Sequence, residues 1–336
     1  MALATFWFIL IAVLWAGFFV LEGFDLGVGM LHTAVARDEA GRRAALNTIG
    51  PLWDGNEVWL IVAAAAMFAA FPGWYATMFS SYYPALVVLL VGLIVRGVSF
   101  EFRGKVDSAR WRSTWDVLLI CGSLLVPLLL GIALGALLHG VPIDGSQEFT
   151  GDLGDIFSGY AVFAGITFVL LCLMHGATFI TLRTTGDVRD RAAGLARPIA
   201  LVTAPVLLAF LPWTHSTAGK GVLPNIPQLL AVMAVIAAAF LVVRGHDGRA
   251  FAATTAAVAT TVLGLFVDLY PRLMVSTTNS AFDLTVHNSA AGEYALKVTS
   301  VVAIVFFPLV LAYQGWTYHV FRRRISADRF AHPVAE

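Results

Sequence analysis

The sequence has little charge and almost no cysteine, and each shortage excludes a class of protein. Of its 336 residues only 12% are charged, about half the share of a typical soluble domain, whereas 59% are hydrophobic. The two cysteines, Cys121 and Cys172, fall inside apolar stretches, where we expect buried thiols rather than a disulfide or a metal pair. The sequence has no CxxC, P-loop or GxGxxG motif. A formal net charge of zero implies no nucleic-acid partner.

Long apolar stretches take the place of these features. A membrane-spanning helix needs about 20 mostly apolar residues. The first stretch is too long for a signal peptide and has no cleavable end of small residues, so we expect it to be retained. The connections are short, and we predict an all-α polytopic membrane protein with a single transmembrane domain over 1–336. Nine segments meet the length requirement: 5–33, 48–71, 76–100, 114–139, 156–182, 196–213, 226–243, 249–270 and 292–320.

Lysine and arginine gather in alternate connections, and this indicates an orientation. The connections after the first, third, fifth and seventh segments, together with the C-terminal tail, hold all but four of the 21 cations. Positive residues mark the cytoplasmic ends of membrane spans. Nine spans with this distribution predict the N-terminus outside and the C-terminus in the cytoplasm.

Two stretches of the sequence resemble one another in layout. "EGFDLGVGMLHTAVAR" ends the first predicted span, and "HGATFITLRTTGDVR" ends the fifth. A fold of two four-helix pseudo-repeats, over 1–140 and 150–270, with a final helix at 292–320, would explain this similarity. Because each repeat has an even number of spans, both repeats would have the same orientation.

The ionisable side chains inside the first three predicted spans all fall in the cytoplasmic half. Glu22 and Asp25 lie in the first span, Asp54 and Glu57 in the second, and Arg96 in the third. Each acidic pair is spaced i, i+3, so its two side chains project from one helix face. We expect four carboxylates and one arginine to face inward where three helices pack tightly. Glycines nearby permit such close packing: Gly23, Gly27, Gly29 and Gly55.

Two interpretations of these charges compete. A carboxylate in a membrane can pair with an arginine and hold helices together, and this interpretation is stronger for Glu22, which lies closest to the midplane. One arginine cannot neutralise four carboxylates, however, and the surplus favours proton transfer. For the first interpretation, we predict a supporting ion pair that involves Arg96 and Glu101. The predicted proton path consists of Glu22, Asp25, Asp54 and Glu57.

The histidines within or near the spans give little support for a cofactor. His32, His139 and His175 are haem ligands in principle, but a lone histidine in a helix is more often a hydrogen-bonded packing residue. No pair of helical histidines suggests a bis-histidine haem. We expect this chain to bind no haem and no metal directly. Its apolar surfaces can still hold a quinone tail, which leaves no signature in a sequence.

Several motifs follow one another in a specific order: "EGFDLGVGML", "IGPLWDGNEVWL", "FAAFPGWYA", "RGVSFEFR" and, in the fifth span, "HGATFITLRTTG". In this order the chain resembles subunit 2 of the cytochrome bd-type quinol oxidases over nearly its whole length. The combination of "GFDLGVG" with "WDGNEVWL" is the specific part of the resemblance. A long outer insertion between the sixth and seventh helices of some relatives is short here.

The resemblance implies an oxidoreductase of the bacterial plasma membrane, a terminal oxidase that oxidises quinol, reduces dioxygen to water and builds a proton gradient. It implies that haems b and d lie in a larger partner, subunit 1, and that this haem-free subunit 2 shapes a proton path from the cytoplasm. It also allows a structural quinone, lipid and small accessory subunits. By motif match, Asp25 and Asp54 are the residues carried over to the proton path, and Arg96 matches a position that can pair with them.

Two other functions remain open from the sequence. A proton-coupled secondary transporter would also have carboxylates in its membrane spans, although such transporters often have inverted repeats and broken helices at the midplane. A purely structural membrane subunit would leave catalysis and proton conduction to its partner. In that case substitutions of Asp25 and Asp54 would affect assembly only.

Overall fold

The computed structural model describes residues 2–221 and 224–331, and the predicted domain of 1–336 includes a few residues outside these ranges. The described chain is almost entirely helical. Its α-helices are α1 (Ala2–Leu31), α2 (Glu39–Asn47), α3 (Trp53–Ala70), α4 (Pro72–Ser81), α5 (Tyr83–Phe102), α6 (Ala109–His139), α7 (Gly159–Arg183), α8 (Gly186–Thr217), α9 (Ile226–Val243), α10 (Asp247–Leu269), α11 (Glu293–Val320) and α12 (Asp328–Ala331).

Eight of the helices in these ranges are long and apolar enough to cross a membrane, namely α1, α5, α6, α7, α8, α9, α10 and α11. The remaining predicted span, 48–71, corresponds to α3, which has 18 residues. Its first turns carry Asp54, Asn56 and Glu57, and these polar residues lower its mean hydropathy. The all-helical membrane fold is thus confirmed, whereas the count of nine spans and the orientation stay predictions.

Three predicted spans have different bounds in the structure. The segment predicted as one helix over 76–100 is divided into α4 and α5, because Tyr82 leaves helical geometry and Pro84 begins a new helix as its second residue. The segment 48–71 becomes helical only from Trp53, after a turn that contains Pro51. The segment 196–213 is the apolar centre of α8. The prediction did not include the first turns of this helix, because they are polar.

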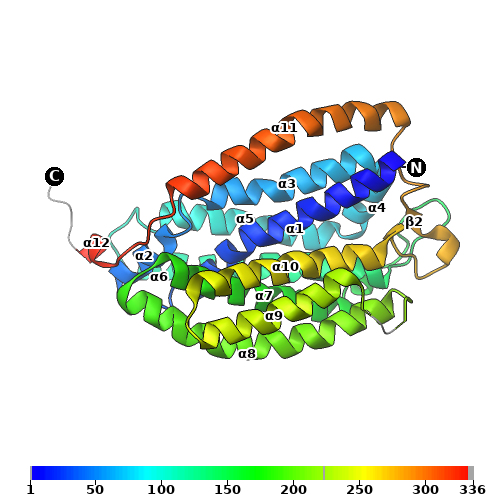
Figure 1. Ribbon diagram of the computed structural model, residues 1–336. Helices are drawn as coiled ribbons and strands as arrows, with labels where there is room; N and C mark the ends of the chain where they lie inside the picture. Colours follow the sequence, from blue (N-terminus) through cyan, green and yellow to red (C-terminus); the bar gives the residue numbers. More distant parts are fainter. Residues whose placement is uncertain (1, 222–223, 332–336) are drawn as a thin grey trace.

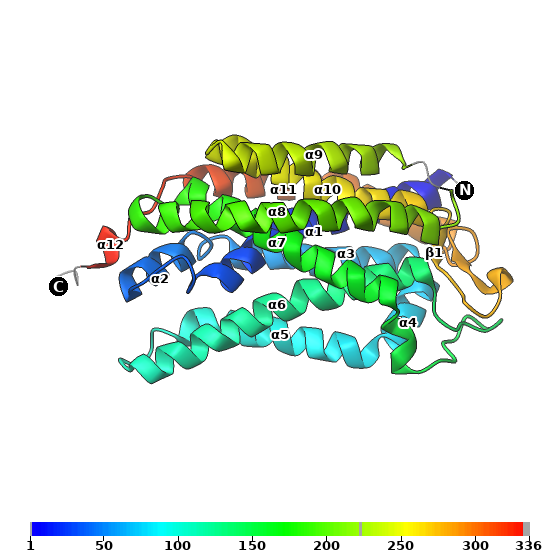
Figure 2. The same ribbon diagram turned by 90° about the horizontal axis from the view of Figure 1, so that it is seen from below.

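The helices form two groups of four, α1, α3, α5 and α6, and α7, α8, α9 and α10, with α1 near the middle of the molecule (Figure 1). The start of α1 lies at one end of the long axis and α12 at the other (Figures 1 and 2). We call the end that holds α2, α12 and the α5–α6, α7–α8 and α9–α10 connections the arginine-rich end. The helix α11 lies on the outside, and Leu296 and Ser300 are its only buried residues within the described chain.

The contact between α1 and α7 depends on glycine. A Cβ atom on Gly27 would lie 2.0 Å from the carbonyl oxygen of Cys172, and one on Gly176 would lie 2.4 Å from the backbone of Gly27. A Cβ on Gly29 would lie 2.1 Å from Oγ of Ser123 on α6. The expectation of close packing is met at these positions. It is not met at Gly55, where the nearest heavy atom is 3.8 Å away.

Two loops cover the end of the bundle opposite the arginine-rich end. In the longer loop β1 (Arg272–Met274) pairs with β2 (Leu284–Thr285) in an antiparallel hairpin. Short 3-10 helices lie at Leu153–Ile156 in one loop and Ser280–Phe282 in the other. Backbone hydrogen bonds join the longer loop to the ends of α3 and α6, since Ala291 N–H donates to Ala70 and Val275 N–H to Leu137.

Candidate functional site

A buried ion pair joins the first, second and third predicted spans. Nη1 of Arg96 on α5 lies 2.6 Å from Oε1 of Glu22 on α1 and 3.1 Å from Oε2 of Glu57 on α3. The Glu22 and Arg96 side chains are fully buried, whereas Glu57 is 23% exposed. Asp25, one turn beyond Glu22 on α1, is also fully buried. The structure therefore brings three of the four predicted carboxylates together with the arginine.

The charges of this cluster do not balance. One guanidinium faces Glu22, Asp25 and Glu57, and fully ionised carboxylates would leave two uncompensated negative charges. Uncompensated charge inside a protein costs several kcal/mol per ion, so three ionised carboxylates beside one arginine are unfavourable. Among the described residues Oε2 of Glu22, Oδ1 of Asp25, and Nε and Nη2 of Arg96 are buried and have no hydrogen-bond partner. These atoms have capacity for further proton donors and acceptors.

Asn56 connects Asp25 to the last long helix, a connection that the sequence analysis missed. Its Nδ2 donates to Oδ2 of Asp25 at 2.7 Å. Its Oδ1 accepts from Nε2 of Gln314 at 2.7 Å and from the hydroxyl of Tyr318 at 3.0 Å, both on α11. Because two donors hold Oδ1, the amide of Asn56 is fixed with its N–H groups toward Asp25. The sequence offered one signal for this connection: Gln314 and Tyr318 are polar residues one turn apart on an otherwise apolar helix.

Two predicted residues lie elsewhere. Asp54 is exposed at the start of α3 and does not face inward with the other carboxylates, because it falls on the side of the helix away from α1. Glu101 is exposed as well, and the predicted ion pair with Arg96 is wrong. The guanidinium of Arg96 is buried and turned toward α1 and α3, where it meets Glu22 and Glu57.

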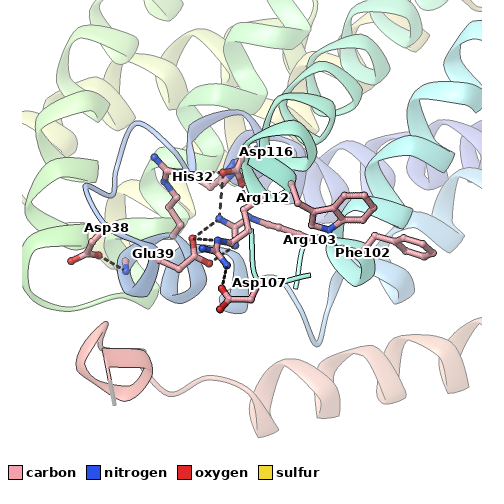
Figure 3. Close-up of polar contacts among 11 residues, drawn as sticks. His32, Asp38, Glu39, Phe102, Arg103, Asp107, Arg112 and Asp116 are labelled. Atoms are coloured by element: carbon pink, nitrogen blue, oxygen red, sulfur yellow. Dashed lines mark hydrogen bonds and ion pairs between the residues drawn. The ribbon is translucent and has the colours of Figure 1, made fainter. Parts of the chain in front are cut away.

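A second cluster lies at the arginine-rich end, between the end of α1 and the start of α6 (Figure 3). Nε2 of His32 lies 2.9 Å from Oδ1 of Asp116, and Nε of Arg103 donates to the same oxygen at 2.6 Å. Arg103 also donates to both carboxylate oxygens of Glu39, at 2.6 and 2.9 Å. Burial opposes the charge of Arg103, but its hydrogen bonds to Glu39 and Asp116 outweigh this and raise the pKa of the guanidinium. Arg42 completes the cluster with a 3.1 Å bond to Asp116.

The buried histidines do not fit a haem-binding role. His175 contacts Oγ1 of Thr254 with one ring nitrogen and the carbonyl of Val20 with the other. Both nitrogens of His32 and both of His215 also have hydrogen-bond partners within this chain. A ring nitrogen that binds iron must be free of such a partner.

An apolar groove of about 680 Å³ lies between α3, α4 and α5. Leucine, valine and aromatic side chains line it, among them Phe68, Tyr75 and Leu90, and Glu57 lies at its edge. Its shape and composition suit a long apolar chain.

Comparison with known proteins places the chain in a family. The sequence profile described as "Cytochrome bd terminal oxidase subunit II" matches residues 3–321. "Cytochrome bd ubiquinol oxidase subunit 2" of Bacillus subtilis (strain 168) is 45% identical over 329 residues, 97% of each chain. "Cytochrome bd-I ubiquinol oxidase subunit 2" of Escherichia coli (strain K12) is 32% identical over 359 aligned positions, covering 96% of this chain and 95% of that one.

A solved structure shows the same fold. A chain in "The structure of bd oxidase from Geobacillus thermodenitrificans" superposes with a TM-score of 0.73 at 17% identity, over 96% of this chain and 99% of that one. With the apolar helices, these matches make the protein a multi-pass bacterial membrane protein and a subunit of an oxidoreductase complex. The family resemblance inferred from the motifs is confirmed: the chain belongs to the cytochrome bd terminal oxidase subunit II family.

Proposed function

We propose that this chain is the haem-free partner of a haem-bearing subunit 1 in a quinol-oxidising terminal oxidase, and that its intramembrane carboxylates carry protons toward the haem site. The observation that carries the proposal is the surplus of buried carboxyls over guanidinium groups around Arg96. A purely structural ion pair needs one carboxylate. Two more at the same place supply positions that gain and lose protons.

The order of the carboxylates supports a path into the membrane. Asp54 is exposed in the first turn of α3, Glu57 lies one turn further along and is partly exposed, and Glu22 and Asp25 are fully buried beyond it. With the arginine-rich end in the cytoplasm, Asp54 is the entry residue, and the buried pair of Asp25 and Glu22 lies beyond it, with Glu22 the deeper of the two. A proton cannot cross a low-dielectric slab as a bare charge and needs such a series of groups.

The chemistry of the complex gives this path its purpose. Reduction of dioxygen to water consumes protons, while oxidation of quinol releases them. If the consumed protons come from the cytoplasm and the released ones leave outside, charge is separated across the membrane. The residues of this chain contribute the cytoplasmic supply, and the haems of the partner contribute the oxygen chemistry.

The partner is proposed to cover the face formed by α3 and α11. Asp54 is exposed on a membrane helix, where lipid would be an unfavourable neighbour for a carboxylate. Nearly all of α11 is exposed and apolar in the isolated chain. A neighbouring subunit on this face would bury both and would receive protons from the carboxylate cluster. The groove between α3, α4 and α5 is proposed to hold a quinone tail.

The test begins with the complex. Purified through a tag on this chain, the complex is expected to contain a larger chain and to show haem b bands and a long-wavelength haem d band in its reduced-minus-oxidised spectrum. Asp54→Asn is expected to slow quinol oxidation while the haem content stays near normal. Glu101→Gln is the matched control, because Glu101 is also exposed and lies outside the path.

Two alternatives predict other results. The bond between Glu22 and Arg96 favours a purely structural subunit, in which Asp25→Asn and Asp54→Asn would lower the haem content and leave the turnover of each assembled complex unchanged. A proton-coupled transporter would purify as a colourless and stable chain without a partner.

A further inference from the structure

A stripe of polar residues, interrupted by Gly29, runs along α1 into the turn that follows it, and its end lies against α6. Glu22, Asp25, Gly29 and His32 are separated by three, four and three residues, so they lie on one face of the helix. Opposite them on α6 lie Ser123, which contacts Gly29, and Asp116, which binds His32. We call the contact between these two stripes the α1–α6 seam. The stripe leads from the buried carboxylates to the cluster at the arginine-rich end.

His32 lies at the end of this seam between two hydrogen-bond acceptors. The ring is fully buried. Nδ1 lies 2.8 Å from the carbonyl oxygen of Gly29, and Nε2 lies 2.9 Å from Oδ1 of Asp116. Both neighbours are hydrogen-bond acceptors, and a neutral imidazole has only one N–H. The ring can satisfy both contacts only when it carries two protons.

The groups around His32 reach from the buried ring to solvent. They are Asp116 of α6, Arg103 after α5, and Arg42 and Glu39 of α2. The Asp116 side chain is 4% exposed, whereas Arg42 is 32% and Glu39 is 39% exposed. One or two hydrogen bonds therefore separate His32 from water at the arginine-rich end, as the chain of contacts in Figure 3 shows.

The seam also has polar atoms on the inner side of His32. Asp25 lies seven residues away on α1, about 10 Å along the helix axis. Between them is Oγ of Ser123, which is buried and has no hydrogen-bond partner among the described residues. The Oδ1 atom of Asp25 is likewise buried and has no hydrogen-bond partner among the described residues. A hydroxyl both donates and accepts, so Ser123 is suited to pass a proton between His32 and Asp25 through bridging water.

We propose that His32 and Asp116 form a second proton-uptake site, which feeds Asp25 along the α1–α6 seam and is separate from Asp54. The inference rests on the proposed proton path and adds an entrance to it. One proton from the cytoplasm converts the neutral ring into the cation. The cation then gives up the proton on Nδ1, the ring nitrogen on the Gly29 side, through water toward Ser123 and Asp25. Asp116 stays ionised between two arginines and holds the ring in place.

The experiment uses the purified complex reconstituted in vesicles, with quinol oxidation and haem content measured for each variant. His32→Gln keeps a polar side chain but removes the titrating ring, and Ser123→Ala removes only one hydroxyl. We expect each to slow turnover with normal haem content, His32→Gln by about twofold, because the entrance at Asp54 still supplies protons and the effect stays below that of removing a sole proton-transfer group. Asp107→Asn is the control, because Asp107 is fully exposed and contacts only Arg112.

A double variant tests whether His32 and Asp25 act in series on one path. If His32 feeds Asp25, His32→Gln combined with Asp25→Asn turns over no more slowly than Asp25→Asn alone, whereas independent effects would multiply. Multiplied effects, or unchanged turnover in Ser123→Ala and His32→Gln, would overturn the second entrance. If His32→Gln fails to assemble, Ser123→Ala alone decides, since it leaves the ion cluster intact. Unchanged turnover in Asp25→Asn would instead refute the proposed function itself.

Discussion

The buried ion pair of Arg96 gives the clearest quantitative prediction. Arg96→Leu removes the one cation that faces Glu22 at 2.6 Å and Glu57 at 3.1 Å. Glu22 and Arg96 are fully buried, so solvent does not screen their interaction. Removing one partner of such a pair leaves an uncompensated buried charge and costs about 3–5 kcal/mol.

Thermal unfolding of the purified complex measures this loss. At about 2 °C per kcal/mol for a chain of this size, the cost corresponds to a decrease in Tm of roughly 6–10 °C. The double variant Glu22→Gln/Arg96→Leu removes the fully buried partner charge as well, and we expect it to recover more than half of the decrease. A double variant with the same Tm as Arg96→Leu, or a lower one, would show that the two residues are not coupled and would refute the reasoning.

Three further predictions concern packing and hydrogen bonds. Gly27→Ala places a Cβ 2.0 Å from a backbone oxygen of α7 and is expected to abolish assembly. Gly104→Ala, with no heavy atom within 4 Å of the new Cβ, is expected to assemble normally. Haem absorbance per milligram of membrane protein measures the assembly of both variants. Tyr318→Phe removes one donor to Asn56 and is expected to lower stability by about 1 kcal/mol, measured as Tm against the exposed control Tyr313→Phe. Asp116→Asn leaves Arg103 and Arg42 without their shared carboxylate and is expected to lower Tm, while Asp107→Asn has no effect; equal values for the two would contradict the assigned contacts.

Much of this organisation follows from the sequence because the membrane simplifies the problem. Apolar length locates helices, and a carboxylate such as Asp25 is conspicuous in an apolar stretch. The prediction that Glu22, Asp25, Glu57 and Arg96 lie together required only helix periodicity and the assumption that charges avoid lipid. Periodicity cannot show which side of a helix faces a missing neighbour, and for this reason Asp54 was expected inside the bundle and is exposed on its surface.

Other parts could not be predicted from one sequence. Asn56 lies between Asp54 and Glu57, and its charged neighbours hid its role, although it makes more contacts in the network than either. The partners Gln314 and Tyr318 are about 260 residues away in the chain. The pairing of His32 with Asp116 spans 84 residues. Contacts of this kind depend on how helices are placed against one another, and local patterns carry no such information.

The weak attachment of α11 has a consequence for the order in which the protein is built. Packing contributes little to its position, and hydrogen bonds hold it near each end: Trp7 donates to Ser300 near one end, and Gln314 and Tyr318 donate to Asn56 toward the other. Since α11 is the last long helix to be synthesised, the amide of Asn56 acquires its fixed direction only after the eight earlier long helices are in place. The hydrogen-bonded site around Asp25 is therefore completed at the final step of translation, and an incomplete chain would insert into the membrane without this site finished.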